Sequence, residues 1–475
     1  MGRVMSLENE LCLHFIPDEP GSHLGSRSAA GPVLQSIGLR PNMSNWTANG
    51  SKIYTDVSGI EVANAECATP EELLALDRAN MEWLAKRLAG VDRLVLSRPN
   101  IEDPDARPKV VAGRVRVYKT NVSQEGMTVG THENYQLFRH RLCRTFNLPV
   151  EETDMNESIL YRMIPTLTPY LVTRQVFAGA GGLDFDQGTY LLSQRAMHMQ
   201  NVIGPQTLSE RGIINTRDEP LGDPGKYMRL HIICGDANMS EFATYLKTGV
   251  TSLVLKLIEE APNMPRLALA DPVREMHDVA RDLTGKTHRL QLQDGRRYCA
   301  LDIQQMYRDM IGKVVGHLSS ADRHVFETYS SVIDLMREND ILDMHEYFDF
   351  ALKHKLLQEI VISKGKDYGS REAAAVALKY HWIDEQGLFN RLEKKVNHRR
   401  ITTDQHVDWL KQHAPNTRAA GRALLIQESR RDRVNINVDW HRFSYDGTSF
   451  PMPDPGNTYL SEARRFLEMR RGSFK

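Results

Sequence analysis

Ser6-Leu7-Glu8-Asn9-Glu10 is a short strand-like segment that places two glutamates two residues apart. Because side chains alternate across a strand with period two, Glu8 and Glu10 project from the same face. Three later segments have the same design; they are Lys52-Ile53-Tyr54-Thr55-Asp56, Thr131-His132-Glu133-Asn134-Tyr135 and Arg229-Leu230-His231-Ile232-Ile233. Together they predict a sheet with carboxylates, imidazoles and an arginine on one wet face, which suits metal ions and phosphate.

The order of elements along the chain predicts an α+β architecture. An early strand is followed by a helix, by more strands and then by a mainly helical second half, which is typical of an antiparallel sheet packed by helices on one side. The other face of such a sheet is open to ligand. Residues 17–51 are rich in Pro, Gly, Ser and Asn and are expected to form a loop. A change in character near residue 405 predicts a large domain over residues 1–404 and a small C-terminal domain over residues 405–475.

The clearest expected helix spans residues 69–90. Thr69 is a good N-cap, Pro70 suits the first helical position and Glu72 completes a capping box. Leucines then recur at helical spacing up to Gly90, which suits a C-cap. A second, buried helix is expected over residues 240–262.

Composition excludes several classes of protein. The formal net charge of −1 gives no general attraction to nucleic acid. The sequence has no apolar run near the ~18 residues that span a bilayer and no signal peptide, so we expect a cytoplasmic protein with neither nucleic-acid nor membrane partners. The five cysteines are dispersed, which argues against a disulfide framework or a zinc knuckle.

The acidic residues Glu8, Glu10, Glu61 and Glu66 are candidate metal ligands. Magnesium prefers hard oxygen ligands, and nucleotide chemistry uses it to neutralise phosphate charge. For one glutamate taken alone, a solvated surface position is the better interpretation, but the pairing of Glu8 with Glu10 favours a functional one. Asp56 could act as a general base or a nucleophile, or equally as a turn-forming residue.

Two histidines and several arginines complete the candidate set. His132 and His231 lie in strand-like segments and could bind metal through neutral imidazole, although a lone histidine is more often a core residue. Arginine offers a planar fork of donors that suits phosphate. Structural salt bridges are the alternative for the arginines, which are Arg174, Arg195, Arg217, Arg229 and Arg418.

Taken together, these motifs resemble one family, the ligase and the depupylase (deamidase) of the prokaryotic ubiquitin-like protein Pup. The densest match runs over residues 212–220 and continues at residues 226–227, 229–231 and 235–238. Further similar blocks lie over residues 132–135, 171–175, 192–195, 401–404 and 417–419. Chance agreement over so many ordered blocks is very unlikely, and the resemblance covers nearly the whole chain.

The resemblance implies a fold of the glutamine-synthetase type, in which a large antiparallel sheet holds ATP and magnesium and a small domain follows. It assigns Asp56 as the catalytic aspartate and places Tyr54 beside the metal ligands. Carried over position by position, those ligands are Glu8, Glu10, Glu61, His132 and His231. The implied phosphate or substrate contacts are Arg195, Arg217 and Arg418.

The implied activity is ATP-dependent attachment of the C-terminal glutamate of a Pup-like modifier to substrate lysines. The depupylase branch carries a long extra loop between the first glutamate strand and the catalytic aspartate, for which residues 9–55 leave no room, so the ligase is favoured. Val438-Asp439-Trp440 also looks more like the ligase. The sequence departs from the family at Gly59-Ile60-Glu61-Val62, where a His-Pro-Glu-Tyr motif is usual. Hydrolysis of the Pup bond, or modifier binding without catalysis, therefore stays open as an alternative.

Overall fold

The computed structural model describes residues 2–19, 25–41, 43–57, 59–91, 93–98, 109–123, 126–148, 155–217, 219–260 and 267–472. Within this part of the chain, the main feature is a ten-stranded sheet in the order β10-β11-β12-β7-β1-β4-β3-β2, with β6 and β5 added beside the second half of β1. The strands are β1 (Met5–Pro17), β2 (Asn45–Trp46), β3 (Lys52–Asp56), β4 (Gly59–Ala63), β5 (Leu94–Arg98), β6 (Lys109–Tyr118), β7 (Thr131–Phe138), β10 (Asn201–Gly204), β11 (Gly212–Asn215) and β12 (Tyr227–Ile232).

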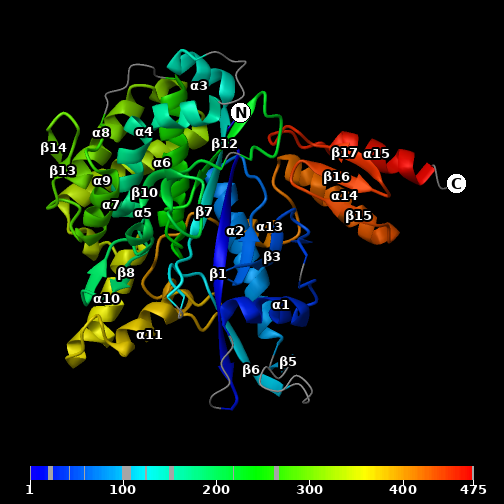
Figure 1. Cartoon of the computed structure of the whole chain (residues 1–475), viewed down its shortest axis with the longest axis horizontal. Helices are drawn as coiled ribbons and strands as arrows, with labels where there is room; N and C mark the ends of the chain where they lie inside the picture. The colour runs from blue at the N-terminus through cyan, green and yellow to red at the C-terminus, as the bar shows by residue number, and fades with distance from the viewer. Residues whose placement is uncertain are drawn as a thin grey trace.

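The α+β prediction is confirmed, with one correction to the sheet. Its pairs are antiparallel except for β10 and β11, which run parallel. Helices supply most of the remaining chain, and Figure 1 shows many of them massed on one side of the long strand β1. They are α1 (Ser26–Ser36), α2 (Pro70–Ala89), α3 (Arg139–Phe146), α4 (Met155–Thr173), α5 (Gln175–Ala178), α6 (Glu241–Glu260), α7 (Pro272–Arg281), α8 (Ala300–Gly312), α9 (Ser320–Glu338), α10 (Asp349–Ile360), α11 (Arg371–Tyr380), α12 (Leu388–Leu392), α13 (Asp404–Leu410), α14 (Arg418–Asp432) and α15 (Leu460–Gly472).

One face of β1 is buried under these helices. Leu7 shares a core with residues of α2 and α6, and Leu11 belongs to a second core that includes Val33 of α1. Because side chains alternate, Glu8 and Glu10 project from the opposite face. The helices thus cover one side of the sheet and leave the other side for the polar residues.

The two expected helices are confirmed as α2 and α6, and residues 261 and 262 of the second expectation lie outside the described residues. The Thr69 side chain accepts a hydrogen bond from the backbone N–H of Glu72 at 3.2 Å, which confirms Thr69 as the N-cap. The Glu72 carboxylate accepts from Ala68 N–H at 3.1 Å, one residue before the N-cap, so the predicted capping box is only half formed. The loop prediction for residues 17–51 is wrong over residues 26–36, which form α1 despite Pro32. Burial of Ala29, Ala30, Val33 and Leu34 stabilises this helix.

The C-terminal part forms a compact unit with its own apolar core, seen at the orange-to-red end of the chain in Figure 1. A three-stranded sheet, β15 (Ile436–Val438), β16 (Arg442–Tyr445) and β17 (Thr448–Pro451), packs with α14 and α15. The boundary after residue 404 stays a prediction. Because Val407 and Leu410 of α13 belong to the main core, we propose that the small domain begins with α14.

Two-stranded sheets complete the fold; they are β8 (Gly182–Asp184) with β9 (Thr189–Leu191), and β13 (Leu290–Gln291) with β14 (Arg297–Tyr298).

In the described parts of the chain, every helix is too short or too polar to cross a membrane.

Candidate active site

Strand register brings the predicted site residues from four strands into one row. Glu8 of β1 lies opposite His132 of β7, and Glu10 lies opposite Glu61 of β4. Glu61 in turn lies opposite Tyr54 of β3. Directly opposed residues of antiparallel strands project from the same face, so these side chains all lie on the open side of the sheet. Asp56, two residues after Tyr54, shares that face.

His231 of β12 extends the row beyond His132. Its backbone partner is Asn134, which lies two residues after His132 and so points the same way. The rings of His132 and His231 are 5.3 Å apart, centroid to centroid. Glu8, His132 and His231 each offer one ligand atom, and these atoms lie within 4.8 Å of one another, as a shared metal ion requires.

Asn134 orients the imidazole of His231. The Asn134 side-chain oxygen lies 2.9 Å from His231 Nδ1, while its amide nitrogen donates to Glu8 Oε1 at 3.0 Å. Since the amide oxygen can only accept, His231 Nδ1 carries the proton and its Nε2 keeps a lone pair. Burial is the main cause that lowers the pKa of His231 to about 3, so the ring is neutral. This is the protonation state that a metal ligand needs.

Glu8, Glu10 and Glu61 concentrate negative charge in the middle of the row. Burial would raise the pKa of Glu8, but its hydrogen bond with His132 and its electrostatic interaction with His231 hold it well below its usual range. Burial and then the Glu8 carboxylate raise the pKa of Glu61 well above its usual value. Carboxylates crowded in this way can supply the oxygen ligands of a divalent cation, so these residues are compatible with bound magnesium.

Tyr54 and Asp56 lie at the β3 end of the row. The Tyr54 hydroxyl hydrogen-bonds Glu61, and burial followed by the Glu61 charge raises its pKa, so it stays protonated. Asp56 ends β3 and pairs with Gly59 at the start of β4. Its side chain is only partly buried, so a reacting group can approach it from solvent.

The three candidate arginines occupy different environments. Arg195 is buried and reaches the row, with its Nη2 atom 3.4 Å from His132 Nε2. Arg217 follows β11, and its side chain is 58% exposed and pairs with Glu219 at 3.2 Å. Arg418 is buried and donates from Nε to Glu66 Oε1 at 2.6 Å. Only Arg195 therefore touches the row directly; Arg217 lies at its rim and Arg418 belongs to the C-terminal unit.

A cavity of about 80 Å³ opens beside Glu8, between the sheet and the C-terminal unit. Its lining includes Arg229 and Arg418 together with Trp440. It is smaller than a typical ligand pocket of ≈ 300–1,000 Å³, so a nucleotide would have to extend from it over the open sheet face.

Asn134 was not among the candidate site residues, whereas Arg229 was a candidate phosphate contact. Asn134 and Arg229 both touch the row: Arg229 Nη1 lies 3.2 Å from Asn134 Oδ1 and 4.0 Å from Glu8 Oε1. The period-two spacing of Asn134 from His132 was the signal that could have identified Asn134, as the same spacing from His231 identified Arg229.

Comparison with known proteins agrees with this geometry. The sequence model of the family described as Pup-ligase protein matches residues 18–444. The chain belongs to the Pup-ligase family. Among its curated relatives, the Pup deamidase/depupylase of Mycolicibacterium smegmatis is 34% identical over 435 residues, covering 89% of this chain and 80% of the relative. The Pup–protein ligase of Corynebacterium urealyticum is 31% identical over 484 residues, covering 95% and 90%.

Solved structures of the same family match the fold over nearly the whole chain. The complex between Pup and its ligase PafA gives a TM-score of 0.82 at 29% identity, covering 98% of this chain and 92% of the other. PafA in complex with ADP gives a TM-score of 0.75 at 28% identity, covering 96% of each chain. The predicted membership of the Pup-ligase family is therefore confirmed.

Proposed function

We propose that this protein is an ATP-dependent isopeptide ligase that attaches the C-terminal glutamate of a Pup-like modifier to lysines of protein substrates. The observation that carries this proposal is the row in which Asp56, Glu61, Glu10, Glu8 and His132 share one open sheet face. The match to PafA, solved with Pup and with ADP, supports both the modifier and the nucleotide. A cytoplasmic location is part of the same proposal.

The first step activates a carboxylate. An oxygen of the modifier's glutamate side chain attacks the γ-phosphorus of ATP, and the bond to the β-phosphate oxygen breaks, which gives an acyl phosphate and ADP. We assign Glu8, Glu10, Glu61, His132 and His231 as the residues that hold magnesium. When bound, magnesium ions neutralise charge on the phosphate oxygens. Arg195 and Arg217, with Arg229 beside Glu8, supply fixed positive charge along the same face.

The second step joins the modifier to its target. The lysine amine attacks the acyl carbon, phosphate leaves, and the nitrogen loses a proton. Free lysine has a pKa of ~10.4, so the amine needs a base to attack at neutral pH. Asp56 is the proposed base, because it is the carboxylate of the row that ends a strand and remains partly exposed.

A direct test mixes the purified protein with ATP, magnesium, a Pup-like modifier that ends in glutamate and a lysine-bearing target. The ligase forms ADP and a conjugate whose mass is the sum of modifier and target minus one water. The second candidate function is hydrolysis of the bond between the modifier and the lysine, which the 34% identity to a depupylase favours. Cleavage of a preformed conjugate without any synthesis would establish that candidate, and modifier binding without either reaction would indicate a non-catalytic homologue.

A further inference from the structure

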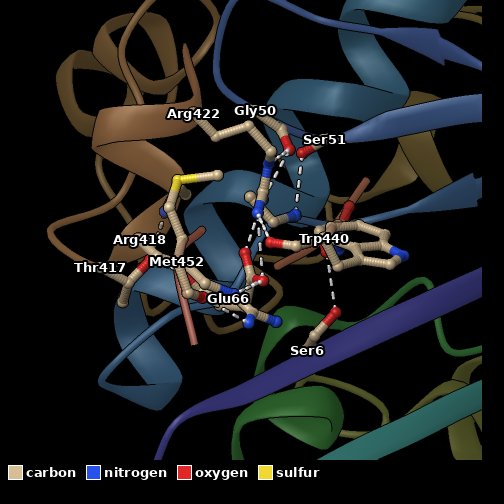
Figure 2. Close-up of polar contacts among 12 residues, drawn as sticks. Ser6, Gly50, Ser51, Glu66, Thr417, Arg418, Arg422, Trp440 and Met452 are labelled. Atoms are coloured by element: carbon tan, nitrogen blue, oxygen red, sulfur yellow. Dashed lines mark hydrogen bonds and ion pairs between the residues drawn. The ribbon is translucent and has the colours of Figure 1, made fainter. Parts of the chain in front are cut away.

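Glu66, which follows β4, is held between two arginines of α14 (Figure 2). Arg418 Nε lies 2.6 Å from Glu66 Oε1, and Arg422 Nη2 lies 2.6 Å from Glu66 Oε2. All three side chains are buried. A buried carboxylate with charge-assisted bonds on both oxygens fixes the relative position of the elements that carry it. Glu66 thus joins the main sheet to the C-terminal unit.

Arg422 continues this connection to the turn before β3. Its Nη2 atom donates to the Gly50 carbonyl at 2.9 Å, and its Nη1 atom donates to the Trp440 carbonyl at 2.9 Å. The guanidinium also lies 5.0 Å from the Trp46 ring and 4.8 Å from the Trp440 ring, within the range of cation–π attraction. One side chain of the C-terminal unit therefore holds the β2–β3 hairpin, which ends at Asp56.

The turn at Gly50 is shaped for this contact. Gly50 has a φ of +81°, and a Cβ atom there would lie 3.1 Å from the Ala419 carbonyl oxygen. The backbone of the hairpin consequently packs directly against the first turn of α14. A shift of α14 would move the hairpin with it.

Arg418 makes a second connection, to the loop between β11 and β12. Its Nη1 atom donates to the backbone carbonyls of Leu221 and Met452, the latter at 3.2 Å. Leu221 has a φ of +47°, which a leucine adopts only when its surroundings hold it there. The same loop is joined to the C-terminal unit by a bond from Asp223 N–H to the Pro453 carbonyl at 3.0 Å. This loop carries Arg217 and lines the cavity beside Glu8.

We propose that Glu66 is a positioning residue for the ligase reaction, acting through two separate arms. Through Arg418 it fixes the loop that lines the cavity beside Glu8, and through Arg422 it fixes the hairpin that aims Asp56. This inference rests on the proposed function and assigns a separate role to each arm. The contacts made through Arg418 serve nucleotide binding, and those made through Arg422 serve transfer to lysine.

Conservative variants separate the two arms. R418K is expected to raise the KM for ATP at least tenfold while kcat stays within threefold, because lysine cannot bridge the carboxylate and the loop carbonyls. R422K is expected to lower kcat of conjugation at least tenfold while the KM for ATP stays within threefold. E66Q should show both effects, and E66D, which keeps the carboxylate, should recover part of each.

E259Q provides the matched control. Glu259 is also buried and pairs with Arg3 at 2.9 Å, but this pair joins the start of β1 to α6, outside the C-terminal unit. E259Q should lower the melting temperature and leave KM and kcat of the folded protein at wild-type values. Equal effects of R418K and R422K on both constants, or changes in melting temperature alone, would overturn the division into arms.

Hydrogen exchange tests the positioning independently of catalysis. R422K should speed exchange in residues 47–53, and R418K should speed it in residues 219–223, each without affecting the other segment. If the wild-type protein makes no conjugate, the proposed function fails, while this exchange pattern and calorimetric ATP binding still decide the inference. Unchanged exchange in both segments would reject it.

Discussion

Glu10 of β1 lies directly opposite Glu61 of β4, so two carboxylates face each other on the open side of the sheet. Like charges in directly opposed positions destabilise a sheet. Tyr54, on the other side of Glu61, adds a hydrogen bond but no positive charge. The arrangement therefore reduces stability unless a cation lies between the carboxylates or Glu61 takes up a proton, which its raised pKa favours.

The first prediction concerns this pair. E61Q removes one of the like charges, so without metal the free energy of unfolding should stay the same or rise by up to about 1 kcal/mol. The magnesium concentration for half-maximal activity should increase at least tenfold, because a ligand is lost. Urea unfolding with and without magnesium, together with a magnesium titration of activity, measures both effects. A marked loss of metal-free stability in E61Q would contradict this account.

The second prediction concerns the proposed base. D56A should lower conjugation by about 10²–10⁴-fold, the usual contribution of a general base, and leave ATP binding unchanged. T55A is the matched control, because Thr55 projects from the opposite face and bonds the Pro41 carbonyl at 3.2 Å. Conjugation should survive in T55A. Conjugation at wild-type rate in D56A would exclude Asp56 as the base.

The third prediction concerns Gly59, the partner of Asp56 across the β3–β4 turn. Its φ of +147° favours glycine, and a Cβ atom would lie 2.5 Å from the Leu11 carbonyl oxygen. G59A should therefore cost about 1–3 kcal/mol of stability and reduce conjugation, since the strand end must move. G38A is the control, because Gly38 also has positive φ but open space around it. Equal stability losses in both variants would show that crowding at Gly59 has no effect.

The fourth prediction is a pH dependence of stability at Glu66. Burial alone would raise the pKa of Glu66, but Arg422 and Arg418 lower it to about 2, compared with an ordinary value of 4.5. A carboxylate with a lowered pKa stabilises the fold fully above pH 4.5, and this contribution is lost as the pH falls toward 2. The expected contribution at neutral pH is about 3 kcal/mol.

The stability difference between the wild type and E66Q should consequently shrink as the pH falls from 6 to 3.5. Urea unfolding of both proteins at several pH values measures this difference. A difference that stays constant over the range would show that the carboxylate of Glu66 titrates normally in the fold.

The fifth prediction separates two arginines of the site. R217A should change stability by about 0–1 kcal/mol, because its pair with Glu219 is exposed, but it should raise the KM for ATP. R195A should cost several kcal/mol, because Arg195 is buried and bonds the Ile233 carbonyl at 3.0 Å and Thr128 at 2.9 Å. Thermal unfolding and ATP kinetics of both variants test the contrast. Equal destabilisation by the two substitutions would contradict it.

The sequence was sufficient to predict which residues share a face. Period-two spacing grouped Glu8 with Glu10, Tyr54 with Asp56 and Arg229 with His231. In the structure, the two members of each pair project from the same face of their strand. Spacing cannot say which strands are neighbours, so the opposition of Glu10 and Glu61 became visible only with the register.

Two other features depend on tertiary contacts that local patterns do not contain. The helix at residues 26–36 holds Pro32 and weak helix formers, and it forms because its apolar side is buried. Arg418 was predicted to contact phosphate or substrate, and that role stays a prediction. Its pairing with Glu66 joins residues 352 positions apart, a distance over which composition and periodicity carry no information.

The row of site residues also has a direction. Going across the sheet from β3, carboxylates come first, at Asp56, Glu61 and Glu10; imidazoles follow, and the arginines at positions 229 and 217 lie at the far end. An ammonium group is attracted to the first end and a polyphosphate to the last. In the proposed reaction, the lysine ammonium and the polyphosphate of ATP are therefore drawn to opposite ends of the row, and the acyl group that is transferred lies between them.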